Sequence, residues 1–118
     1  MPRLSGQSKR GSFHSAIGGV VTGSSGLTTN LVVPAGTIWK GVISFWGEVN
    51  ATSIPPAIVA NDGTQFIYLT AQQNAGASGK AGFSQYVELN AGTWALTGFS
   101  GFNGSSNNVA YAGNAWYK

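Results

Sequence analysis

The sequence predicts an all-β protein, an antiparallel β-sandwich in the form of a jelly roll, preceded by an extended N-terminal arm. Composition is the first reason: 18 glycines together with 4 Trp, 4 Tyr and 6 Phe favour strands and tight turns over helices. Spacing is the second, because about seven or eight short apolar or alternating segments recur every 8–12 residues, separated by Gly, Pro and Asn. The length of 118 residues fits a single domain.

The first 29 residues form the predicted arm, and the sandwich domain is expected to span residues 30–118. The arm contains six Gly and six Ser but few large apolar side chains, so it offers little material for a core. Residues 16–21 are expected to form at most a short strand, broken by Gly18 and Gly19. Residues 22–30 are expected to form a polar turn region.

The net charge of +3 is concentrated in the arm. Arg3, Lys9 and Arg10 account for it, because the other charges cancel (3 − 3 = 0): Lys40, Lys80 and Lys118 against Glu48, Asp62 and Glu88. One interpretation is a solvated tail. The other is a docking arm, with Arg3, Lys9, Arg10 and Phe13 as contact residues, that binds an acidic protein surface. Nucleic acid is the weaker expectation, since three charges neutralise too few phosphates for strong binding.

The first half of the domain contains a strand that is apolar on both faces. Residues 31–33 form a short apolar run that Pro34, Ala35 and Gly36 end, and residues 36–47 follow as a strand with large apolar side chains on both sides. A strand with one solvent-exposed face should alternate between apolar and polar residues. This strand is therefore expected either at the centre of the sandwich or beneath another subunit, which predicts an oligomer.

The remaining strands are separated by clear turn signals. Pro55 and Pro56 precede a brief strand at residues 57–60, a hairpin-type turn at 61–63 and a strand at 65–71. A small, polar loop is expected at 72–82. Residues 83–89 then alternate, residues 90–92 turn the chain, and residues 93–102 carry Trp94 and Leu96 on one face and Phe99 on the other. After a loop at 104–107, an alternating strand at 109–117 completes the domain.

Five aromatic side chains are candidates for the core or for an oligomer contact: Trp39, Phe45, Trp46, Trp94 and Trp116. Trp94 follows a Gly-centred turn and is predicted to anchor its strand in the core. Exposed tryptophans near Asn and Gln would instead suit stacking on sugar rings.

The sequence contains no recognisable catalytic or cofactor motif. Its few candidate acids and bases, His14, Glu48, Asp62 and Glu88, are scattered, and there is no cysteine. Neither a nucleophile elbow nor a phosphate-binding loop is present. The sequence predicts a non-enzyme with no cofactor and no metal. It also has no apolar run long enough for a membrane span and no signal-peptide core.

Two similar segments carry a resemblance to a known class of proteins. Residues 86–94 (YVELNAGTW) and 33–39 (VPAGTIW) share an apolar strand end, an Ala-Gly-Thr turn and a following Trp. We interpret them as equivalent corners of two sheets. The longer segment resembles a corner found in small jelly-roll virion proteins of tailed bacteriophages, of the capsid decoration (cement) or fibre type.

This resemblance implies a structural virion protein made in the host cytoplasm. It also implies a homo-oligomer, with a trimer favoured, that docks on the major capsid protein or another virion protein. The alternative is a carbohydrate-binding module of a host-recognition tail or head fibre, with a glycan as its partner.

Overall fold

The computed structural model describes residues 11–24, 26–49, 57–70, 79–99 and 107–118. These residues form six antiparallel strands: β1 (Phe13–Gly23), β2 (Leu27–Val49), β3 (Ala57–Asn61), β4 (Phe66–Thr70), β5 (Gly79–Phe99) and β6 (Asn107–Tyr117). The strands are hydrogen-bonded in the order β1-β6-β2-β5-β3-β4. The predicted all-β, antiparallel class is confirmed.

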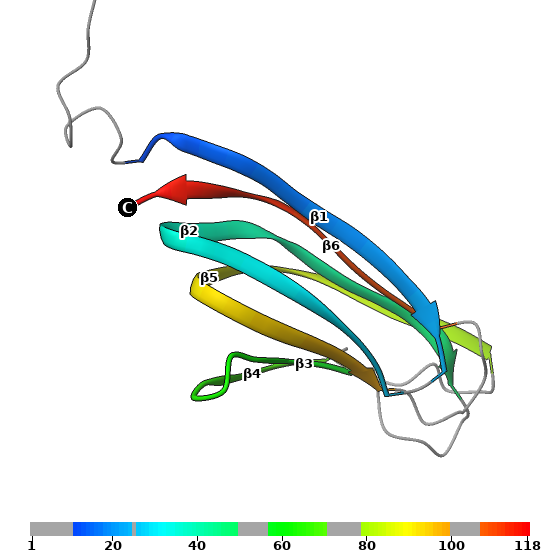
Figure 1. Cartoon of the computed structure of the whole chain (residues 1–118). Helices are drawn as coiled ribbons and strands as arrows, with labels where there is room; N and C mark the ends of the chain where they lie inside the picture. The colour runs from blue at the N-terminus through cyan, green and yellow to red at the C-terminus, as the bar shows by residue number, and fades with distance from the viewer. Residues whose placement is uncertain (1–10, 25, 50–56, 71–78, 100–106) are drawn as a thin grey trace, which may run out of the picture.

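Two long strands, β2 and β5, form a ribbon that doubles back on itself (Figure 1). One half pairs residues 38–49 of β2 with residues 79–90 of β5, beside β6 and β1. The other half pairs residues 27–33 of β2 with residues 92–98 of β5, beside β3 and β4. The core therefore lies between two layers that share one continuous ribbon, in the manner of a sandwich.

The ribbon bends where the two similar sequence segments meet. Val33 pairs with Gly92, and the register then shifts before Ile38 pairs with Asn90. Gly36 (φ 78°) and Gly92 (φ 143°) adopt positive φ values at this bend, which glycine does without steric cost. The two segments thus lie side by side at a single corner, and residues 34–36 and 90–92 bend two long strands where we expected them to end strands.

The N-terminal prediction is wrong for residues 13–29. Residues 13–23 form β1, an unbroken strand that pairs with β6 from Phe13↔Trp116 to Gly23↔Asn107, and β2 begins at Leu27. Gly18 and Gly19 do not break β1, because the neighbouring strand supplies the hydrogen bonds and Tyr111 lies over Gly19. The arm residues Arg3, Lys9 and Arg10 lie outside the described residues.

The core contains the inward-facing residues of both layers. Trp39, Ile43 and Phe45 of β2 and Val109 of β6 come from one layer, and they meet residues that the opposite layer contributes: Leu31, Ile58, Leu69, Trp94 and Leu96. A Cβ atom added to Gly98 would lie 2.5 Å from Val109 and 2.7 Å from Phe45. Because Gly98 has no side chain, the two layers can approach closely there.

The hairpin turn between β3 and β4 lies where the sequence predicts it. Asp62 Oδ1 accepts hydrogen bonds from the backbone N–H groups of Gln65 (2.7 Å) and Thr64 (2.9 Å), and Asn61 Oδ1 accepts one from Gly63 N–H (2.8 Å). Gly63 adopts φ 100°. The side chains of Asn61 and Asp62 therefore stabilise the turn, in a position where a longer backbone ladder would otherwise be needed.

This turn should respond to acid. The hydrogen bonds from Gln65 and Thr64 stabilise the Asp62 carboxylate and lower its pKa below the ordinary 3.8. Its contribution is complete above the unfolded pKa and is lost as the pH falls through the lower folded pKa. We expect NMR titration of Asp62 to give a midpoint below 3.8, and the Asp62→Asn variant to lose the acid dependence of amide exchange at Gln65. A midpoint at or above 3.8 would contradict this account.

Candidate functional site: the outer face of the sheet

The β1-β6-β2-β5 layer turns one side toward the core and the other toward solvent. We call the solvent side the outer face. It consists of five rows of residues paired across the strands: Phe13, Trp116, Ile38 and Asn90; Ala16, Asn114, Lys40 and Glu88; Gly18, Ala112, Val42 and Tyr86; Val20, Ala110, Ser44 and Ser84; Thr22, Asn108, Trp46 and Gly82. Alternation along each strand puts these residues opposite the core set.

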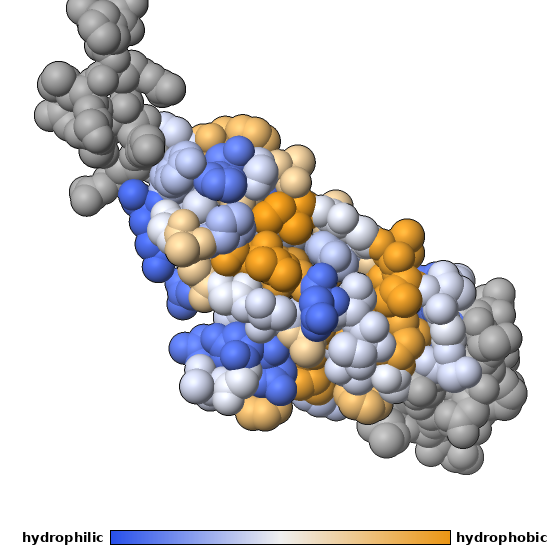
Figure 2. All heavy atoms as spheres, in the orientation of Figure 1, coloured by the Kyte–Doolittle hydropathy of each residue, from blue (hydrophilic) through white to orange (hydrophobic). Residues whose placement is uncertain are grey.

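Large apolar side chains of the outer face are exposed. Val20 is 69% exposed, Tyr86 57%, Phe13 53% and Trp46 49%, and Val42 is also exposed. They occur in four of the five rows, all but the row of Lys40. The apolar surface therefore extends along the layer. Figure 2 shows one side of the molecule, on which apolar areas (orange) alternate with polar ones. A stable monomer seldom exposes so many large apolar groups on one face.

Neutral hydrogen bonds connect the strands across this face. Ser44 and Ser84 hydroxyl oxygens lie 3.0 Å apart, and Thr22 Oγ1 donates to Asn108 Oδ1 at 2.6 Å. Within these five rows the charged residues are Lys40 and Glu88, which are cross-strand partners. The five rows are therefore electrically balanced, as residues 30–118 are by sequence.

Tyr86 has a perturbed hydroxyl. Its O–H donates to Glu88 Oε2 at 3.0 Å, and this bond, followed by partial desolvation and the charge of Glu88, raises the pKa of Tyr86 above its ordinary value of 10.0. The shift is away from neutral pH, so the hydroxyl remains a donor to the Glu88 carboxylate there.

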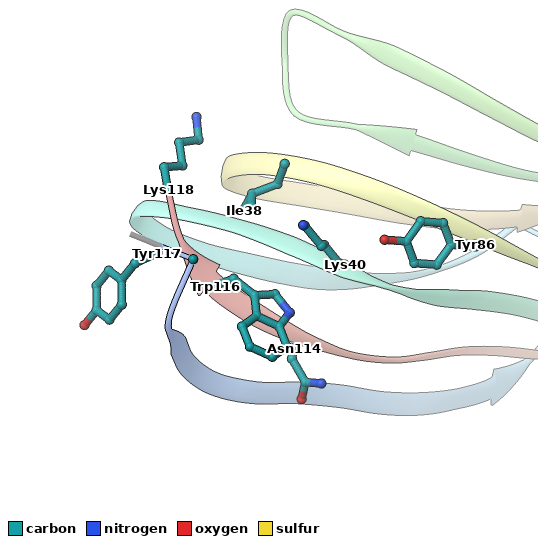
Figure 3. A pocket seen from close by; sticks show the side chains of 8 residues that line it. Ile38, Lys40, Tyr86, Asn114, Trp116, Tyr117 and Lys118 are labelled. Atoms are coloured by element: carbon teal, nitrogen blue, oxygen red, sulfur yellow. The ribbon is translucent and has the colours of Figure 1, made fainter. Parts of the chain in front are cut away.

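A shallow groove of about 660 Å³ lies at one end of the outer face, lined by Gly11, Ile38, Lys40, Tyr86, Asn114, Trp116, Tyr117 and Lys118. Figure 3 shows Lys40 between Ile38 and Tyr86, with Trp116 and Asn114 on the neighbouring strand. The groove thus combines aromatic rings, an amide and two lysines.

Aromatic contacts join β1 to β6 beside this groove. Phe13 and Trp116 pack edge to face with ring centroids 5.7 Å apart, and His14 packs against Tyr117 at 4.9 Å. Backbone bonds tie the chain here too, because Gly11 N–H donates to Tyr117 O and Tyr117 N–H donates to Ser12 O. Phe13 is therefore part of the folded sheet, where we expected a contact residue of a separate arm.

The five predicted aromatics divide between core and surface. Trp39, Phe45 and Trp94 are buried. Trp46 and Trp116 belong to the outer face with Phe13. Val20, Val42 and Tyr86 are not among the residues that the sequence marks as surface candidates. The signal for Val42 was present, since it alternates with Trp39 and Ile43, but the sequence alone does not say which of the two faces is buried.

The described titratable residues do not form a catalytic cluster. Asp62 lies in the β3–β4 turn, Glu88 on the outer face and His14 in β1, where its Nδ1 lies 2.8 Å from Ser15 Oγ. No group of three or more His, Asp or Glu residues that could hold a metal ion occurs in the described ranges. Those ranges also contain no helix with the length and hydropathy of a membrane span.

The chain matches no protein-family model and no curated protein.

Proposed function

We propose that this chain is a non-enzymatic structural virion protein that oligomerises and docks on a viral shell as a capsid decoration (cement) protein. The observation that carries the proposal is the outer face, on which Phe13, Val20, Val42, Trp46 and Tyr86 are exposed around the cross-strand pair of Lys40 and Glu88. Such a face is suited to burial against another protein, because desolvating it costs little.

Two further features support this proposal. The sequence resembles small jelly-roll virion proteins at the corner where β2 and β5 bend, and an all-β sandwich is compatible with a jelly roll. The excess positive charge in residues 1–10 would add an electrostatic contact to an acidic shell protein. The proposal therefore combines an apolar contact through the outer face with a charged contact through the N-terminal residues.

The test is rebinding of the purified protein to virus particles stripped of it, after antibodies have located it on intact particles. We expect the double variant Val42→Ser with Trp46→Ser to bind at least tenfold more weakly, because both exposed side chains lose apolar contact area. Val32→Ser is the matched control, since Val32 is exposed on the other layer and should leave binding unchanged. Equal binding by the double variant and the wild type would overturn the role of the outer face.

A salt series separates the charged contact. A chain lacking residues 1–10, which keeps the bonds that Gly11 and Ser12 make to Tyr117, should lose the salt-dependent part of particle binding. The remaining apolar contact should persist in molar salt, where screening lengths fall to about 3 Å. Identical salt dependence with and without residues 1–10 would show that they are a solvated tail.

A second candidate function rests on the groove. Trp116 and Tyr86, with Asn114 and the lysines beside them, form the combination of aromatic faces and polar groups that binds sugar rings, as in a module of a host-recognition fibre. A glycan array probed with the full chain tests it. Glycan binding that Tyr86→Ala abolishes, by protein that does not bind particles, would favour this function over decoration.

A further inference from the structure

We propose that β1 is a dimerisation edge, at which two copies of the chain pair their β1 strands antiparallel about a two-fold axis near Gly18. This inference extends the proposed oligomerisation by naming its surface and symmetry, and it does not depend on the viral shell.

The two edges of the sheet differ in how they avoid pairing with another strand. Edge strands are usually protected by shortness, by Lys or Pro, or by a bulge. β4, at one edge, has only five residues. β1, at the other, has 11 residues, about 35 Å of backbone at the usual rise per residue, and contains no Lys, Arg, Asp, Glu or Pro. Its single irregularity lies at its start, between Phe13 and Ser15.

The far side of β1 has no partner strand among the described residues. From Ser15 to Gly23 the strand pairs with β6 in unbroken register, so its opposite side presents a regular series of backbone groups. Val20 on its outer face is 69% exposed, and Ile17 and Val21 on its inner face are only partly buried. A further strand at this edge would cover all three side chains.

The chemistry of β1 favours a second copy over a different protein. Identical strands bring identical charges together, which costs energy when the strand is charged, and β1 carries no Lys, Arg, Asp or Glu. An antiparallel pair of identical strands is also self-complementary, so each backbone donor meets the matching acceptor. A foreign partner is commonly selected through complementary charge, which β1 does not offer.

One register fits the side chains best. If the axis passes through Gly18, the whole strand pairs, with Phe13 of one copy opposite Gly23 of the other. Val20 then faces Ala16, Val21 faces Ser15 and Ile17 faces Gly19. Each larger side chain meets a smaller one, so the two strands approach without crowding. The two copies would share one continuous outer face.

The symmetry of this contact departs from the trimer that the resemblance implies. A two-fold axis closes after two copies, so the particle in solution should have twice the chain mass of 12.1 kDa. Light scattering on the full chain measures this directly. A monomer or a trimer would overturn β1 pairing, while a trimer would leave the proposed decoration function intact.

A substitution at the edge tests the surface. Val20→Lys should give a monomer with an unchanged circular dichroism spectrum, because Val20 is exposed and an edge lysine blocks strand addition. The control is Tyr68→Lys, at an exposed position on the opposite edge strand, β4, which should remain dimeric. Dimerisation that survives Val20→Lys would overturn the proposal, as would its loss in Tyr68→Lys alone.

Crosslinking tests the register. The chain has no cysteine, so Ala16→Cys and Val20→Cys can be combined without background. Together they should give a covalent dimer with a short bifunctional maleimide, because position 16 faces position 20 of the other copy. Either cysteine alone should not, since like positions are offset by four residues, about 14 Å. Failure of the double variant, or equal crosslinking by a single one, would overturn this register.

Discussion

Replacing Trp39 by alanine is expected to lower the free energy of unfolding by about 3–5 kcal/mol, the usual cost of truncating a large buried aromatic side chain. Trp39 is fully buried, and its Nε1 donates to Ile17 O at 3.1 Å, across β6. The indole thereby joins β2 to β1. Denaturant unfolding of the variant, compared with the wild type, measures the loss.

The environment of Trp39 explains why its loss should be severe. Gly41 and Gly113 pair with each other across β2 and β6, and a Cβ atom on either would lie 2.6–2.7 Å from the indole Cζ2. The ring therefore occupies space that two glycines leave open, and neither can fill the cavity that Trp39→Ala would create.

Two control variants test whether the loss of stability in Trp39→Ala comes from the packing around its indole. Trp46→Ala, on the half-exposed outer face, should change the free energy of unfolding by less than about 1 kcal/mol. Gly113→Ala should destabilise by about 1–3 kcal/mol, because its methyl group would overpack against Trp39 and Lys40 O. A loss below about 1 kcal/mol for Trp39→Ala would show that the indole does not join the strands.

Trp94→Ala is expected to have a similar effect, again about 3–5 kcal/mol. Trp94 is 1% exposed and pairs across the ribbon with fully buried Leu31. Its Nε1 donates to Asn90 O at 2.8 Å, which connects the buried ring to the bend of β5. The substitution should therefore both open a cavity and loosen the bend at Gly92.

Trp94→Phe separates these two contributions. Phenylalanine keeps most of the apolar contact but cannot donate to Asn90 O, so its loss should be clearly smaller than that of alanine. Chemical denaturation of both variants gives the comparison. A change under about 1 kcal/mol for Trp94→Ala would mean that the side chain contributes little to the core and would favour a ligand-binding role for it.

Local patterns in the sequence predict the structure correctly where residues close together in the chain determine it. The alternation of residues 83–89 predicts that Val87 and Leu89 share one face of their strand, and both are buried. The Asn-Asp-Gly segment predicts the β3–β4 turn, because its own side chains satisfy the turn's backbone. Trp94 and Leu96 share one face, as their spacing requires.

The outer face was only partly predictable. The sequence marks residues 36–47 as apolar on both sides, which identifies Trp46 as a candidate contact residue. It does not identify Val20 or Tyr86, because they join this face only through strand pairing. Val20 reaches it through β6, and Tyr86 is placed there by its pairing with Val42.

The sequence by itself determined the all-β class, the turn at residues 61–63 and the burial of Trp94. Only the tertiary structure decided that residues 13–23 form a strand, that β2 and β5 continue through their glycine corner, and that Trp39 faces inward while Trp46 faces outward. The physical reason is the range of the interactions. Propensity and alternation act between neighbours, whereas β1 depends on β6, which lies about 90 residues away in the chain. The hydrogen bonds from β6 offset the low strand propensity of Gly18 and Gly19.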